Sequence, residues 1–270
     1  MSLDWQVWLR AALAKVQVPP LRQRVPLLGN GEPIGSVEPD FLLPFAGLGN
    51  TYKHCVLQKN EQQNAWNLQG DIDAGLAQLA AALRQAELTG AWRNELLRVH
   101  NAHGEVVARV ERAAVRPLGI ATEAVHLVGL MQDERIWVQQ RSLDKPNDPG
   151  LWDTLMGGMI SAQDTLAQAL ARETWEEAGL QLAQLDQLWH GGHIDFASPS
   201  GDGGGAGYLV ERIDWFTARV PDHLTPNNQD GEVAQFACLT RGEVLNFMGQ
   251  GLFTLEAGLI LAAAMGLQNA

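Results

Sequence analysis

The chain has 270 residues, of which 46% are hydrophobic and 19% charged, and it contains nine tryptophans. This balance excludes disordered, collagen-like and low-complexity proteins, and the length suits one large domain or two modest ones. The formal net charge of −12 provides no positive field for nucleic acid or for an anionic membrane, so we expect neither as a partner.

The two cysteines, Cys55 and Cys238, are too few for a disulfide scaffold or a cysteine-based metal centre, which favours a reducing compartment. The first residues lack a basic stretch followed by an apolar one, and no segment offers about 18 consecutive uncharged apolar residues. We therefore expect a cytoplasmic protein.

Apolar residues recur at helical or strand spacing at four places before residue 120. They predict helices over residues 5–16 and 76–86 and a hairpin with strands over residues 96–99 and 106–110. Ser2 is the expected cap of the first helix, and Pro19 and Pro20 end it. Between residues 20 and 70, prolines interrupt the short apolar runs, and the pattern supports no assignment.

The character of the sequence changes after Gly119, and we place a domain boundary near residue 120. The predicted elements beyond it are strands over residues 124–131 and 136–140, a short strand into Gly157 and Gly158, and helices over residues 165–178 and 254–267. Mixed strands with helices on both faces indicate an α/β sandwich. We expect a smaller N-terminal α+β accessory domain at 1–120 and an α/β domain with a mixed sheet at 121–270.

The segment over residues 158–180 carries the clearest chemical signal. On a helix, side chains three and four positions apart are neighbours, so Glu173 lies beside both Glu176 and Glu177. Arg172 lies beside Glu176. Carboxylates this close repel one another unless a cation holds them, and a hard, oxygen-preferring ion such as Mg²⁺ is the natural partner. The alternative is a solvated helix face whose ion pair contributes about 0.3–0.5 kcal/mol.

Glycines on both sides of the helix favour the cation site. Gly158 precedes the helix and Gly179 follows it, and average composition would place both glycines and the four charged residues at these offsets on the order of 10⁻⁷ times per position. The segment resembles the Nudix box, Gly-x5-Glu-x7-Arg-Glu-(aliphatic)-x-Glu-Glu-x-Gly-(aliphatic). Asp164 replaces its first Glu and Thr174 its aliphatic residue, and neither change removes a metal ligand.

The resemblance implies a Nudix α/β/α sandwich and a site for Mg²⁺ or Mn²⁺ that faces a substrate diphosphate. The implied metal ligands are three side chains and one backbone carbonyl, from Glu173, Glu176, Glu177 and Gly157. Arg172 would orient Glu173. Diphosphate hydrolysis needs cations that neutralise phosphoryl oxygens and activate water, together with a carboxylate that accepts the proton of that water.

Three residues outside the box are further candidates. Glu232 follows a turn at Asp230, and Nudix proteins often bring a carboxylate from this region to the metal, as a ligand or as the general base. Glu173 is the other candidate base, and an ordinary turn is the alternative interpretation of the Glu232 segment. Arg141 and Lys145 precede a Pro/Gly loop that enters the box, and we expect both to contact substrate phosphate.

A longer set of segments is similar to a Nudix subgroup with an extra N-terminal domain, related to the Nudix part of thiamine pyrophosphokinase fusions. These segments cover residues 91–95, 110–113, 137–142 and 230–236. The similarity implies hydrolysis of thiamine diphosphate, or of its oxidised derivatives, to the monophosphate and phosphate. Because oxidation removes the positive charge of the thiazolium ring, selection for oxidised forms predicts apolar walls without unpaired carboxylates from residues 192–208 and from Trp152 onward.

Other functions stay open at this point. The substrate could be a nucleoside diphosphate derivative, or the domain could be an inactive Nudix-like ligand-binding regulator, which would have no need of three clustered carboxylates. Isopentenyl diphosphate isomerases share the fold, but neither Cys55 nor Cys238 lies in a motif that matches their catalytic cysteine. The segment Gly201–Gly207 lacks the ending of a phosphate-binding loop and is expected to be a surface loop. A homodimer is one possible oligomeric state.

Overall fold

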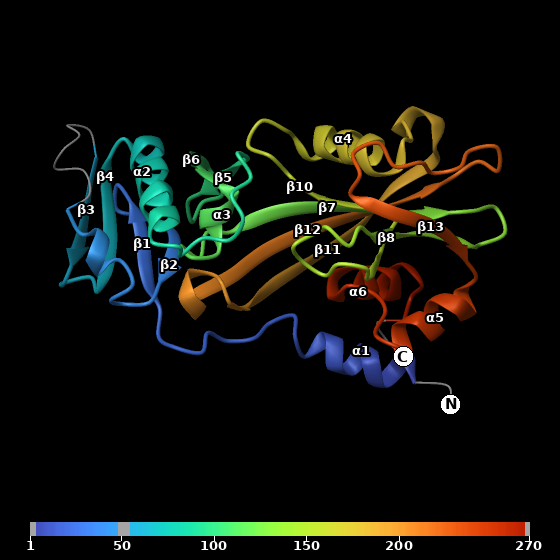
Figure 1. Ribbon diagram of the computed structural model, residues 1–270, viewed down its shortest axis with the longest axis horizontal. Coiled ribbons are helices and arrows are strands. Elements are labelled where there is room, and N and C mark those ends of the chain that lie inside the picture. Colours follow the sequence, from blue (N-terminus) through green and yellow to red (C-terminus); the bar gives the residue numbers. More distant parts are fainter. Residues whose placement is uncertain (1–3, 48–54, 268–270) are drawn as a thin grey trace.

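A computed structural model of the chain describes residues 4–47 and 55–267. The elements form two regions side by side along the long axis of the molecule, each built on its own sheet (Figure 1). A two-stranded sheet lies between them. We refer to the N-terminal sheet with its helix and this small sheet as the first region, and to the sheet beyond residue 120 with its helices as the second region.

Helix α1 (Trp5–Leu13) forms where the apolar spacing predicts the first helix. Its cap is Asp4, whose side chain accepts a hydrogen bond from the backbone N–H of Gln6 at 3.0 Å. Ser2, the expected cap, lies outside the described residues.

The stretch that supported no assignment forms a four-stranded sheet. Its strands, in the spatial order β2-β1-β4-β3, are β1 (Val25–Gly29), β2 (Glu32–Val37), β3 (Cys55–Asn60) and β4 (Ala65–Gly70). Strands β1 and β4 are parallel, and the other neighbours are antiparallel. Helix α2 (Ile72–Gln85), which was predicted, buries Leu76, Leu79 and Leu83 in one core with Trp66 of the sheet.

The predicted hairpin is confirmed, because β5 (Leu96–His100) and β6 (Val106–Glu111) pair antiparallel. The single-turn helix α3 (Arg112–Val115) follows β6 directly. Arg112 and Arg116 are four positions apart, which places their side chains on the same side of this turn. The hairpin and α3 thus bring two arginines to the junction between the regions.

The second region contains a seven-stranded mixed sheet in the order β11-β12-β7-β8-β13, with β10 beside β7 and β9 beside β8. The strands are β7 (Thr122–Leu130), β8 (Ile136–Arg141), β9 (Trp152–Asp153), β10 (Met156–Met159), β11 (Asp186–Ser200), β12 (Gly207–Arg219) and β13 (Val233–Leu239). The predicted helix α4 (Leu166–Ala178) covers one face, and the other face carries α5 (Arg241–Gly249) and the predicted final helix, α6 (Leu255–Ala264) (Figure 1). The expected α/β sandwich is confirmed.

Helix α1 packs in the second region although it opens the chain. Its Leu9 and Ala12 are buried in the same core as α5 and α6 (Figure 1). The boundary near residue 120 remains a proposal. It separates the two large sheets, but it assigns α1 to the region on which this helix does not pack. Among the described residues, no helix has the length and apolar character needed to cross a membrane.

The long hairpin of β11 and β12 reaches back to the first region (Figure 1). At its tip, the N–H of Gly203 donates to the carbonyl of Leu88 at 3.1 Å, and the N–H of Tyr208 donates to the carbonyl of Arg116 at 2.9 Å. The segment Gly201–Gly207, expected as a surface loop, is therefore a docked turn that joins the two regions.

Candidate active site

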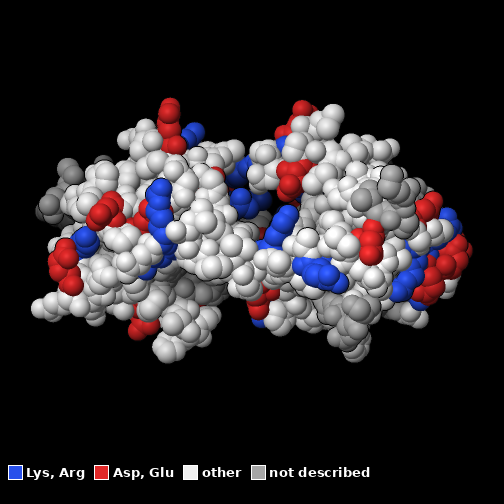
Figure 2. Space-filling model, turned by 90° about the horizontal axis from the view of Figure 1, so that it is seen from below, with Lys and Arg blue, Asp and Glu red and all other residues white. Residues whose placement is uncertain are grey.

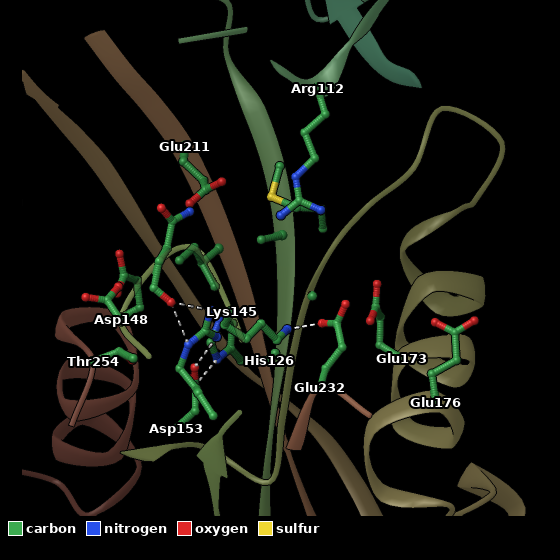
Figure 3. A pocket seen from close by; sticks show the side chains of 18 of the residues that line it. Arg112, His126, Lys145, Asp148, Asp153, Glu173, Glu176, Glu211, Glu232 and Thr254 are labelled. Carbon is green, nitrogen blue, oxygen red and sulfur yellow. Dashed lines mark hydrogen bonds and ion pairs between the residues drawn. The ribbon is translucent and has the colours of Figure 1, made fainter. Parts of the chain in front are cut away.

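A cavity of about 300 Å³ lies where the two regions meet. Its walls come from α3, α4, β7 and β12, from the loops around β9 and β10, and from the start of α6. Figure 2 shows the molecule hollowed near its middle, with basic side chains inside the hollow. Figure 3 shows the side chains that line the cavity, with acidic and basic groups facing one another across it.

Helix α4 forms one wall because its two sides differ in polarity. Thr165 caps the helix in a capping box with Gln168, and Gly179 ends it in the left-handed region at φ 64°. The buried apolar side packs on the sheet through Ala169, Leu170 and Ala178. The charged side faces the cavity with Arg172, Glu173 and Glu176.

Arg172 joins the acidic side chains of this wall into one cluster. Its guanidinium lies 2.8 Å from Glu173, 2.9 Å from Glu176 and 2.8 Å from Asp164. Burial disfavours the charged form of Arg172, but the three carboxylates outweigh it and raise the pKa of the guanidinium. Asp164 thus reaches Arg172 although it is one methylene shorter than the glutamate of the box pattern.

Glu177 lies behind the cavity wall, with only 2% of its side chain exposed. Its Oε2 accepts hydrogen bonds from Gln139 at 2.7 Å and from the backbone N–H of Gly157 at 2.9 Å. Its Oε1 lies 3.6 Å from the Lys145 ammonium. Burial raises the pKa of Glu177 to about 7, against the opposing effect of Lys145. One carboxylate oxygen is therefore fixed, and the other remains available to a cation.

Two glycines bring the backbone of β10 close to the charged groups. A Cβ on Gly158 would lie 2.1 Å from the carboxyl carbon of Glu173, and a Cβ on Gly157 would lie 2.5 Å from the His126 ring. Only glycine leaves room for these side chains at both positions. The backbone at Gly158 therefore lies directly against Glu173, and the Gly157 carbonyl that the resemblance implies as a ligand is one residue before it.

The donor set fits a hard divalent cation, because it consists of carboxylate and carbonyl oxygens. In the part of the chain that the structure describes, no three acidic, histidine or cysteine side chains already surround a common point. Glu173 and Glu176 are instead held by Arg172. Binding of a cation would therefore require these two carboxylates to turn toward the backbone cradle at Gly157.

The other predicted site residues meet at the same cavity. Lys145 forms an ion pair with Glu232, which lies on the turn before β13 (Figure 3). Burial lowers the pKa of Lys145, while Glu177 opposes this effect. Arg141 lies 3.3 Å from Asp153. Every site residue predicted from the sequence lines the cavity except Glu177, which is buried immediately behind it.

His126 is a cavity residue that the sequence did not single out. Its Nδ1 lies 3.0 Å from the hydroxyl of Thr154 and 3.5 Å from Asp153. The Thr154 hydroxyl donates to the Met156 carbonyl at 2.7 Å, so the proton of the ring belongs on Nδ1. Burial lowers the pKa of His126. Burial thus favours the neutral ring, in which a proton on Nδ1 leaves Nε2 as a hydrogen-bond acceptor.

The wall opposite α4 contradicts the expected apolar lining. Figure 3 shows Asp148 and Glu211 on this side and Arg112 entering from the first region. Glu256 and Arg116 also line the cavity. The expected apolar walls are absent because residues 192–208 run along the hairpin to the first region. Trp152 does not line the cavity either, because its ring lies 5.7 Å from that of Phe247 in the core.

Comparisons with known proteins show what the second region is similar to. Residues 121–252 match the family model of the NUDIX domain. Over 167 residues the chain is 28% identical to Nudix hydrolase 20, chloroplastic, of Arabidopsis thaliana. The aligned residues cover 60% of this chain and 43% of the plant protein. Over 74 residues the chain is 35% identical to an uncharacterized Nudix hydrolase of Pseudomonas aeruginosa. The aligned residues cover 27% of this chain and 44% of that protein. The chain spans less than half the length of these two curated relatives.

A solved structure completes the comparison. The crystal structure of a Deinococcus radiodurans protein superposes with a TM-score of 0.49 at 20% identity, covering 63% of this chain and 98% of that one. The family match confirms the Nudix part of the resemblance noted in the sequence. It does not address the subgroup or the first region, because the matched residues begin at 121.

Proposed function

We propose that the Nudix domain formed by residues 121–252 hydrolyses the diphosphate of a small organic molecule with the help of a divalent cation, Mg²⁺ or Mn²⁺. The observation that carries the proposal is the acidic cluster around Arg172 on one wall of a cavity that also holds cationic side chains. Such a cavity can bind an anionic diphosphate and the cation that neutralises it.

In this proposal each residue of the cluster has a defined task. Glu173, Glu176, the Oε1 of Glu177 that now faces Lys145, and the Gly157 carbonyl would hold the cation. Arg172 would orient Glu173 through their 2.8 Å contact. A divalent cation bound there would neutralise phosphoryl oxygens and lower the pKa of the attacking water.

The proton of that water would pass to a carboxylate at the edge of the cavity. Glu232 is one candidate base, because it lines the cavity and pairs with Lys145. Glu173 is the other candidate. Lys145 and Arg141 would contact the phosphate oxygens, since both side chains lie at the cavity.

As the first substrate to test we propose thiamine diphosphate or an oxidised derivative, cleaved to the monophosphate and phosphate. The carboxyl groups of Asp148, Glu211 and Glu256 offer hydrogen-bond acceptors, which supports an organic group that carries N–H donors, as thiamine does. These groups give the site no means of rejecting intact thiamine diphosphate, whose thiazolium ring is cationic. We therefore expect thiamine diphosphate to be hydrolysed at least as efficiently as its oxidised forms.

Nucleoside diphosphate derivatives are the second candidate class. Among the described residues, no Phe, Tyr or Trp side chain lines the cavity, so a nucleobase would find no aromatic ring on which to stack. A regulator without activity is the third candidate, and the complete set of carboxylates around Arg172 argues against it.

The proposal includes a cytoplasmic location and no nucleic-acid partner. Cys55 and Cys238 are both free thiols, as a reducing compartment would require. The net charge of −12 opposes binding to a phosphate backbone.

Phosphate release from a panel of diphosphates with Mg²⁺ tests the proposal. The panel contains thiamine diphosphate, its oxidised forms, a dinucleotide and ADP-ribose, with EDTA as the metal-free control. We expect release from at least one small diphosphate and none in EDTA. Tight binding of a panel member without turnover would instead favour the regulator.

A further inference from the structure

The cationic side chains of the cavity fall into two groups. Five arginine or lysine residues among the described ones line it: Arg112, Arg116, Arg141, Lys145 and Arg172. Three of these belong to the second region, and each lies within 4 Å of a carboxylate of that region. A diphosphate that enters the cavity must therefore share these three cations with acidic side chains that already contact them.

Arg112 and Arg116, from the first region, have more donors to spare. Arg112 contacts Glu95 through one nitrogen at 2.8 Å, although a guanidinium carries five N–H groups. Arg116 lies 3.7 Å from Asp202, which is beyond hydrogen-bond distance. Figure 3 shows Arg112 reaching into the cavity from above, between Glu211 and Glu173.

The backbone holds both arginines in place. The N–H of Arg112 donates to the carbonyl of Glu95 at 2.9 Å, and the carbonyl of Arg116 accepts from Tyr208 at 2.9 Å. Both side chains also line a smaller cavity of about 110 Å³ beside the first one. The backbone of both residues is thus held beside the two cavities, and their side chains, 39% and 37% exposed, are accessible to a ligand.

A third acidic group, besides Glu95 and Asp202, lies near both arginines. Glu211 on β12 lines the same two cavities, and its carboxylate accepts a hydrogen bond from the Thr122 hydroxyl at 3.0 Å. Burial raises the pKa of Glu211, while Arg116 and Arg112 oppose this effect. Arg112 uses one nitrogen in its contact with Glu95, and Arg116 makes no contact shorter than 3.7 Å with Asp202, so both guanidinium groups keep donors for a further anion.

We propose that Arg112 and Arg116 bind phosphate oxygens of the substrate, so that the first region completes the binding site. The diphosphate would lie between these guanidinium groups and the carboxylate cluster of α4. Guanidinium groups suit this task because their planar donors match two phosphate oxygens at once. The identification of the ligand as a diphosphate rests on the proposed function.

Binding of methylenediphosphonate, a diphosphate analogue that is not hydrolysed, tests this inference by calorimetry on the full chain with Mg²⁺. We expect Arg112→Gln and Arg116→Gln each to weaken binding about tenfold, the loss of one charge-assisted hydrogen bond. Arg22→Gln is the matched control in the first region, because Arg22 forms a surface ion pair with Glu38 and is 71% exposed. That variant should bind as the wild type does.

A second variant separates binding from local damage. Glu95→Gln breaks the same ion pair as Arg112→Gln but keeps the guanidinium, so it should bind the analogue at least as tightly as the wild type. Wild-type affinity in both arginine variants would overturn the inference, as would an equal loss in Glu95→Gln. Hydrolysis of diphosphates with an unchanged KM in Arg112→Gln would overturn it while leaving the proposed function intact. Weakened binding in a protein that hydrolyses no diphosphate would support it and contradict the function.

Discussion

The two ends of the cavity balance charge in different ways. At the α4 end, Arg172 lies within 3 Å of three carboxylates, and the cluster is complete without a ligand. At the opposite end, Arg112 and Arg116 keep free donors, and burial raises the pKa of both Glu256 and Glu211. The α4 end is therefore held together by its own ion pairs before a ligand binds. The opposite end needs the counter-charges of a ligand, so we expect it to determine which ligand binds.

The largest expected effect comes from removing a carboxylate at the α4 end. Glu176→Gln and Glu177→Gln should each lower kcat a hundredfold or more, about 3 kcal/mol of transition-state stabilisation, because the cation would lose a ligand. Glu176 is 40% exposed, so its variant should keep the fold. Steady-state rates with Mg²⁺ and thermal melting measure the two effects, with the exposed Glu61→Gln as control. Near-normal turnover in both variants would rule out the cluster as the metal site.

Glu232 tests which group accepts the proton. If Glu232 is the base, Glu232→Gln should lower kcat about a hundredfold while the Mg²⁺ concentration for half-maximal rate stays constant. If it is a ligand, that concentration should rise instead. Titration of the rate with Mg²⁺ distinguishes the two roles, and an unchanged titration curve would remove Glu232 from the site.

Gly158 tests the close approach of the backbone at the α4 end. In Gly158→Ala the new Cβ must displace the Glu173 carboxylate, so we expect about a tenfold loss of kcat, or about 1.4 kcal/mol. Gly242→Ala is the matched control, since nothing lies within 4 Å of its Cβ position and its activity should not change. Equal activities of the two variants would show that Glu173 does not depend on this contact.

Glu256 gives a smaller, pH-dependent effect at the opposite end. Burial raises the pKa of Glu256 from 4.5 to about 7, so the folded protein favours its neutral form. The stability from this group is complete below pH 4.5 and is lost as pH rises through 7. In EDTA, Glu256→Gln should match the wild type near pH 4.5 and exceed its unfolding free energy by about 1–2 kcal/mol at pH 8. Urea denaturation at the two pH values measures this, and a pH-independent difference would contradict it.

The α4 end could be predicted from the sequence because its determinants are local. Thr165, Arg172 and Gly179 lie within one helix and its caps, where fixed spacing determines which side chains are neighbours. The Asn30–Gly31 pair is also a local signal, typical of a hairpin turn, and both residues have positive φ between β1 and β2. The prolines on both sides of this pair interrupt the apolar pattern, so the pattern did not predict the hairpin.

The opposite end could not be predicted because its residues come from distant parts of the chain. Arg112, Glu211 and Glu256 meet only because the first region docks on the β11–β12 hairpin and α6 begins beside them. No spacing rule relates residues so far apart. His126 was missed for another reason, since a single histidine in the apolar run of β7 is typical of a core residue.

The most direct test of the account is ³¹P NMR of the panel diphosphates, incubated with Mg²⁺ and either the wild type or Glu176→Gln. The account predicts that the wild type converts the paired signals of at least one diphosphate into those of a monophosphate and inorganic phosphate. The same signals should persist with Glu176→Gln and in EDTA. Persistence of every diphosphate signal with the wild type and Mg²⁺, or equal conversion by Glu176→Gln, would contradict the proposed metal-dependent hydrolysis.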